Sequence, residues 1–123
     1  MSRILVIEDS SAIALLIKRR LEMAGHSVET LANGDLALKR LEDGELPELV
    51  VADVMMPGLD GLSTLRQIRD RHPGLPVILV TGQDLDEKQR QEADAVFAKP
   101  IEFDSLLATI RRLTSRPGAG APN

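Results

Sequence analysis

The stretch Leu49-Val50-Val51-Ala52-Asp53 sets the pattern for the whole chain, because four apolar residues in a row are followed directly by a carboxylate. A short, continuous apolar run is typical of a strand that is buried on both faces of a parallel sheet. The same pattern recurs at residues 4–7 before Glu8-Asp9, at residues 77–80 before Thr81, and at residues 95–98 before Lys99. These runs therefore predict a parallel sheet whose strands end in chemically capable side chains.

Helix-like segments alternate with these runs along the chain. After the first run, Ser10 or Ser11 can cap a helix that ends near Gly25. The apolar residues on one face of this helix are Ile13, Leu16, Ile17 and Leu21. The other helices are expected at residues 34–43, between the Pro57-Gly58 turn and His72, at residues 84–92, and from Phe103 to Leu113. The segment 84–92 is almost wholly polar, so its helix should be weak or short.

Residues 27–31 read as a further, more polar strand that suits the edge of a sheet. Five βα units with right-handed crossovers predict an α/β fold, a three-layer α/β/α sandwich with about five helices around a five-stranded parallel sheet. The polar edge strand favours the flavodoxin-like order 2-1-3-4-5. We expect residues 1–115 to form this domain, and residues 116–123, which lack core-forming side chains, to be a disordered tail or a truncated linker.

Composition excludes several classes of function. A chain of 123 residues is long enough for one domain with a real core, and its net charge of −4 argues against direct nucleic acid binding by this domain. The absence of cysteine excludes disulfides and thiolate metal sites and favours a cytoplasmic location. Because the first apolar run meets acids at once, we expect neither a signal peptide nor a membrane span.

The strand ends bring three acids, one hydroxyl and one amine to a single edge of the sheet. Mg²⁺ prefers such hard oxygen ligands, so Asp9 and Asp53 could bind it while Glu8 orients a metal-bound water. A carboxylate is also a competent nucleophile toward phosphorus, and Lys99 would add a second cation beside the acceptor. Thr81 could donate its hydroxyl to a phosphoryl oxygen. Each of these residues alone is more often a cap, a turn former or a surface charge, but their convergence favours a phosphoryl-transfer site.

The stretch from Leu49 to Gly61 strongly resembles the phosphoacceptor loop of the receiver domains of two-component response regulators. The acidic pair, Thr81-Gly82 and Lys99-Pro100 follow the order of that family, and the resemblance extends from about Arg3 to about Arg112. It implies a flavodoxin-like phosphoacceptor domain that takes part in a phosphorelay and binds partners according to its phosphorylation state.

The resemblance implies that Asp53 accepts a phosphoryl group from a sensor histidine kinase or a histidine phosphotransfer protein in a Mg²⁺-dependent reaction. The metal would be bound by Glu8, Asp9, Asp53 and the backbone carbonyl of Met55. Phosphorylation would switch the binding of a downstream protein target. The domain would not be an enzyme beyond its self-catalysed phosphotransfer and autodephosphorylation.

Two further residues have roles by the same resemblance. Lys99 would contact the phosphoryl group, and the bond from Lys99 to Pro100 would be cis. Thr81 would move toward the phosphoryl group and shift the face formed by the last strand and the last two helices.

The chain departs from the family pattern at two places. Val96 stands where many members carry a switching aromatic ring, while Phe97 points to the opposite side of its strand. The segment from Thr81 to Lys99 is about one helical turn, roughly four residues, shorter than the family pattern, and Glu92 replaces a usual glycine. An alternative is therefore an atypical receiver that acts as a phosphorylation-independent adaptor. If the switch operates, we expect phosphorylation to order residues 83–92.

Two rival classes fit the residues less well. A haloacid-dehalogenase-like phosphohydrolase would need a second aspartate two residues after Asp53, where Met55 stands, and a cap domain. A flavin-binding flavodoxin is disfavoured because the acidic loop at Glu8 and Asp9 would repel a phosphate.

Overall fold

Strands and helices alternate strictly along the chain in the computed structural model, which describes residues 2–55 and 60–114. The strands are β1 (Arg3–Ile7), β2 (Ser27–Leu31), β3 (Leu49–Asp53), β4 (Val77–Thr81) and β5 (Ala95–Ala98). The helices are α1 (Ser11–Met23), α2 (Gly34–Glu42), α3 (Gly61–Arg71), α4 (Glu87–Glu92) and α5 (Phe103–Thr114). The predicted Pro57-Gly58 turn and the tail at residues 116–123 lie outside the described residues.

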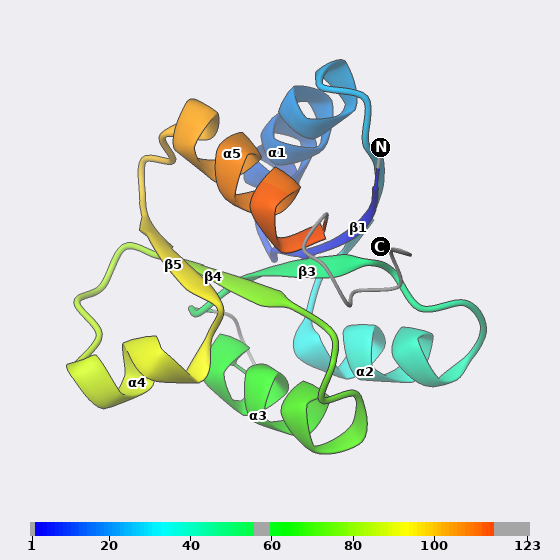
Figure 1. Cartoon of the computed structure of the whole chain (residues 1–123), viewed down its shortest axis with the longest axis vertical. Helices are drawn as coiled ribbons and strands as arrows, with labels where there is room; N and C mark the ends of the chain where they lie inside the picture. Colours follow the sequence, from blue (N-terminus) through cyan, green and yellow to red (C-terminus); the bar gives the residue numbers. More distant parts are fainter. Residues whose placement is uncertain (1, 56–59, 115–123) are drawn as a thin grey trace.

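All strand pairs are parallel, and the sheet has the order β2-β1-β3-β4-β5. Helices α1 and α5 cover one face of this sheet, and α2, α3 and α4 lie on the other (Figure 1). The predicted three-layer sandwich and its strand order are therefore confirmed. The polar strand at residues 27–31 is β2, and it lies at the edge as expected.

Two hydrophobic cores, one on each face of the sheet, hold the layers together. Every residue of β3 and β4 is buried, as the continuous apolar runs predict. Alternate side chains point to opposite faces, so Val50 packs in the core beneath α2 and α3 whereas Val51 packs in the core beneath α1 and α5. The same alternation in β5 directs Val96 to the first core and Phe97 to the second.

Local signals in the sequence set where the helices begin and end. The Ser10 hydroxyl accepts a hydrogen bond from the Ile13 N–H at 3.3 Å, so Ser10, and not Ser11, caps α1. Asn33, Asp60 and Asp86 cap α2, α3 and α4 in the same way. Gly44 follows α2 with φ of 109°, a left-handed conformation that glycine adopts without steric cost.

The expected core face of α1 was wrong at one position. Ala14, Ile17 and Leu21 are buried, but Leu16 is 51% exposed. Adjacent residues are separated by about 100° around a helix, so the stripe centred on Ile17 carries Leu16 to its margin. The face toward the sheet is completed by Ala14, a small side chain that a search for large apolar residues overlooks.

We predict that Ile17→Ala lowers the free energy of unfolding by about 2–5 kcal/mol, because it leaves a cavity beneath α1. Leu16→Ala on the same helix should change it by no more than about 0.5 kcal/mol, since its side chain is half exposed. Urea unfolding of the two variants measures both values. Equal losses would show that Leu16 contributes to the core as the sequence pattern suggested.

Candidate phosphoryl-transfer and metal site

The strand register brings the predicted site residues to one edge of the sheet. Ile7 of β1 pairs with Ala52 of β3, so the acids that follow β1 lie beside Asp53 at the end of β3. On the other side, Thr81 at the end of β4 pairs with Ala98 of β5, and Lys99 follows directly. The positions of these side chains thus follow from the parallel pairing of their strands.

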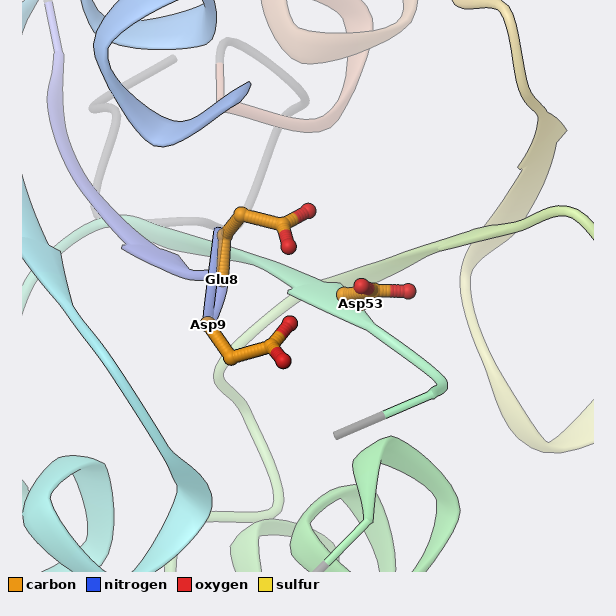
Figure 2. Close-up of side chains that lie close together, drawn as sticks. All are labelled: Glu8, Asp9 and Asp53. Carbon is orange, nitrogen blue, oxygen red and sulfur yellow. The ribbon is translucent and has the colours of Figure 1, made fainter. Parts of the chain in front are cut away.

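Three carboxylates form the centre of the site. Figure 2 shows the side chains of Glu8, Asp9 and Asp53 extending from the ends of β1 and β3 toward a common space. One oxygen from each lies within 4.8 Å of the others. Glu8 and Asp53 are each only 4% exposed, whereas Asp9 is open to solvent. The cluster is therefore partly buried but accessible from one side.

Lys99 connects two of these acids through its ammonium group. Its Nζ donates to Asp53 Oδ2 at 3.1 Å and to Glu8 Oε1 at 3.4 Å. The peptide bond between Lys99 and Pro100 is cis, as the family resemblance implied. The structure thus places a positive charge in direct contact with the predicted phosphoacceptor.

The close packing of these groups changes their proton affinities. Burial is the largest cause that raises the pKa of Glu8 to about 7. The charge of Asp53 and its hydrogen bond act in the same direction, whereas the Ser10 N–H and Lys99 act against it. Burial alone would lower the pKa of Lys99, but its hydrogen bond to Asp53 and the charges of Asp53 and Glu8 outweigh this and raise it. Lys99 therefore stays positively charged at neutral pH, whereas Glu8 changes its charge there.

The donor set fits a hard divalent cation. Mg²⁺ is usually bound by one or two carboxylates together with several waters, and the exposed side of Asp9 leaves room for solvent. A cation would also relieve the repulsion between the three acids. Met55 lies next to them, and its N–H donates to Asp53 Oδ1 at 3.2 Å. Its carbonyl as a further ligand stays a prediction.

Thr81 lies at the same edge but has a local hydrogen-bonding partner. Its side chain is buried, with 2% exposure, and Oγ1 accepts a hydrogen bond from the Gln83 N–H at 2.9 Å. The hydroxyl is therefore engaged with the β4–α4 segment. Contact with a phosphoryl group would require this hydrogen bond to change.

Gly61 is a positioning residue that the sequence patterns do not single out. A Cβ at Gly61 would lie 2.3 Å from the Asp53 carbonyl oxygen and 2.7 Å from Val54 Cα. The Gly61 N–H also donates to the Val54 carbonyl at 3.0 Å. The start of α3 thus packs directly on the backbone that carries Asp53. In the sequence, Gly61 is marked only by its place at the end of the stretch from Leu49 that resembles the phosphoacceptor loop.

No helix within residues 2–55 and 60–114 has both the length and the apolar character needed to cross a bilayer.

Comparison with known proteins gives consistent matches. Residues 4–111 match the family model described as the response regulator receiver domain. The DNA-binding transcriptional regulator NtrC of Salmonella typhimurium is 38% identical over 114 residues, which cover 89% of this chain and 24% of that protein. The alkaline phosphatase synthesis transcriptional regulatory protein PhoP of Bacillus subtilis is 34% identical over 125 residues, 98% of this chain and 52% of that protein.

Solved structures agree with these matches. The response regulator protein TrrA of Thermotoga maritima, solved in complex with Mg²⁺ and BeF, superimposes with a TM-score of 0.85 at 33% identity. The superposition covers 92% of this chain and 99% of the other. The receiver domain of the Francisella response regulator 1452 gives 0.84 at 30% identity, covering 93% and 97% of the two chains.

We predict that Glu8→Gln stabilises the metal-free protein more at pH 8 than at pH 5. A carboxyl whose pKa rises on folding stabilises the folded state only below its unfolded pKa, and this contribution is lost as the pH rises from about 4.5 through 7. Glutamine carries no charge and avoids that loss. In EDTA, the difference in unfolding free energy between variant and wild type should shift by at least about 1 kcal/mol between the two pH values. A difference that is independent of pH would contradict the raised pKa of Glu8.

We predict that Gly61→Ala lowers the unfolding free energy by about 1–3 kcal/mol, because the added methyl group overlaps the backbone of Asp53 and Val54. Gly74→Ala is the matched control, since nothing lies within 4 Å of a Cβ there, and should stay within about 0.5 kcal/mol of wild type. Chemical denaturation compares the two variants. If Gly61→Ala were as stable as the control, the close approach of Gly61 to the backbone of Asp53 and Val54 would not contribute to stability.

Proposed function

The chain belongs to the response regulator receiver domain family, and on that premise we propose that Asp53 is the residue that accepts a phosphoryl group. One observation carries the assignment. The buried Asp53 carboxylate lies among two further acids and in contact with the Lys99 ammonium at 3.1 Å. Among the acids of the cluster, Asp53 alone belongs to a strand, as the last residue of the central strand β3. Its two carboxylate oxygens accept hydrogen bonds from the Met55 N–H and from Lys99.

The proposed reaction is a displacement at phosphorus. An Asp53 oxygen attacks the phosphoryl group of a phosphohistidine, the new P–O bond forms as the P–N bond breaks, and the bonding electrons leave with the imidazole nitrogen. Water can later attack the same phosphorus and restore the carboxylate and inorganic phosphate. Such self-catalysed dephosphorylation needs no separate enzyme.

The remaining side chains stabilise charge in this reaction. Lys99 holds its proton and offers N–H donors to the phosphoryl oxygens, which carry most of the charge in the transition state. Glu8, Asp9, Asp53 and the Met55 carbonyl would hold Mg²⁺, which when bound supplies additional positive charge beside those oxygens. Thr81 would exchange its hydrogen bond with Gln83 for one to the phosphoryl group.

The donor in this proposal is a sensor histidine kinase or a histidine phosphotransfer protein, and the receiver of the signal is a downstream protein target. The chain spans about a quarter of NtrC and half of PhoP, so what those whole proteins do is not carried over to it. We further propose that residues 1–115 form the receiver unit, followed by a tail or linker, and that the domain acts in the cytoplasm.

The alternative of a phosphorylation-independent adaptor is less well supported. An adaptor with a fixed conformation would have no use for three clustered acids, a buried phosphoacceptor and a lysine aimed at it. A phosphohydrolase is also disfavoured, because Met55 stands where that class carries its second aspartate. Both alternatives predict that the protein does not retain a phosphoryl group on Asp53.

We predict that acetyl phosphate with Mg²⁺ adds the mass of one phosphoryl group to the wild-type protein and that Asp53→Asn abolishes this gain. An amide cannot act as the nucleophile, while its shape preserves the packing at the end of β3. Asp70→Asn is the matched control, because Asp70 is an exposed acid on α3 away from the cluster. Intact-mass spectrometry in Mg²⁺ and in EDTA measures the gain. An undiminished gain in Asp53→Asn would show that another residue is phosphorylated.

A further inference from the structure

Two arginines of α3 hold the segment that joins α4 to β5. The Arg66 guanidinium makes a bidentate ion pair with Glu92, the last residue of α4, with Nε at 2.8 Å and Nη2 at 3.0 Å from the two carboxylate oxygens. Arg66 itself is largely exposed, but the paired geometry is the form in which an arginine–carboxylate interaction is strongest. The hydrogen bond that Glu92 accepts from Arg66 lowers the pKa of the Glu92 carboxyl below its ordinary value.

Arg69, one turn further along α3, makes more contacts. Its Nη2 donates to Asp94 Oδ2 at 2.6 Å, its Nη1 to the Leu75 carbonyl at 2.9 Å, and its Nε to the Glu92 carbonyl at 3.4 Å. Both Arg69 and Asp94 are half-buried, with side-chain exposures of 30% and 21%. A single guanidinium thus joins α3, the approach to β4 and the end of α4.

Asp94 is in turn fixed to the sheet. The same Oδ2 that pairs with Arg69 accepts a hydrogen bond from the Val77 N–H at 2.8 Å, and the Asp94 N–H donates to the Val77 carbonyl at 2.9 Å. Displacing Asp94 would therefore deprive the half-buried Arg69 guanidinium of its carboxylate partner and leave the Val77 N–H of β4 without its acceptor, which is costly. We call Arg66, Arg69, Glu92 and Asp94 the α3 clamp.

The other end of α4 has no comparable attachment among the residues that the structure describes. No residue of α4 is buried, and its capping box between Asp86 and Gln89 is local to the helix. Before it, Gly82 has open space around its Cβ position, and only Leu85 contributes to a core. Figure 1 shows α4 at the margin of the molecule, next to α3. The sequence alone assigned low stability to all of residues 83–92, but these contacts divide the segment in two.

We propose that the α3 clamp confines the rearrangement that follows modification of Asp53 to residues 82–86 and keeps the α4–β5 junction in place. This inference rests on the proposed phosphorylation of Asp53. When the Thr81 hydroxyl turns toward a phosphoryl group, it releases the Gln83 N–H, so the change begins at the unattached end of the segment. The clamp stops the change before Glu92, because moving the junction would break the contacts of Arg69.

Hydrogen–deuterium exchange of the whole chain, with and without Mg²⁺ and beryllofluoride, tests this proposal. In the wild type, beryllofluoride should alter exchange at residues 82–86 and leave residues 92–95 unchanged. In Arg66→Ala, exchange at residues 92–95 should be about two- to fivefold faster before any addition, as loss of one ion pair implies, and beryllofluoride should now alter it. Glu92→Gln removes the same pair from the other side and should behave alike.

Arg71→Ala is the matched control, because Arg71 is an α3 arginine whose ion pair is with Glu42 of α2 and not with α4. It should show the wild-type pattern. A wild type in which residues 82–95 respond together, or an Arg66→Ala variant with unchanged exchange at residues 92–95, would overturn the clamp. Beryllofluoride binding is followed separately by fluorine NMR, and a failure to bind would overturn the proposed function and the inference that rests on it.

Discussion

Three carboxylates held within 4.8 Å of one another are the constraint on which the rest of the site depends. Two unit charges about 4 Å apart repel by about 1 kcal/mol in water and by several times more near a protein surface. The chain relieves this repulsion with the Lys99 ammonium and with the raised proton affinity of Glu8. A bound divalent cation would be a third way to relieve the repulsion between the carboxylates. The cluster therefore favours the binding of a cation.

The sequence predicted most of the fold because the signals that define it are local. Continuous apolar runs predicted β3 and β4, a polar run predicted the edge strand β2, and a capping serine predicted the start of α1. The prediction was wrong at Leu16, where two possible apolar stripes overlap on α1 and only packing against the sheet decides between them. The choice depended on Ala14, whose small side chain gives little hydrophobic signal.

The sequence predicted the site residues that follow the ends of strands. It did not predict the contacts that form where α3 packs against distant segments. Glu8, Asp53 and Lys99 come together because parallel strands end at one edge, which topology alone implies. The contacts of Gly61 with the Asp53 backbone and of Arg69 with Asp94 depend on how α3 packs. In the sequence, Arg69 is one of several charged residues on a helix, and no periodic pattern separates it from its solvated neighbours.

The direction of the β5 side chains bears on how a signal could leave the site. Val96 packs against the core on the α2 and α3 side, and Phe97 packs against the opposite core, beneath α1 and α5. Because residue 96 is a valine, no aromatic ring at that position can move and carry a change at Thr81 across the sheet. Among the residues that the structure describes, the hydrogen bond from the Gln83 N–H to Thr81 links the site directly to the segment before α4. The C-terminal end of α4 is attached through ion pairs, whereas the segment before α4 is attached through Leu85 in the core and the contact between Thr81 and Gln83. A small change at the hydroxyl therefore acts first on the side of α4 that has no ion pair to α3 among the described residues.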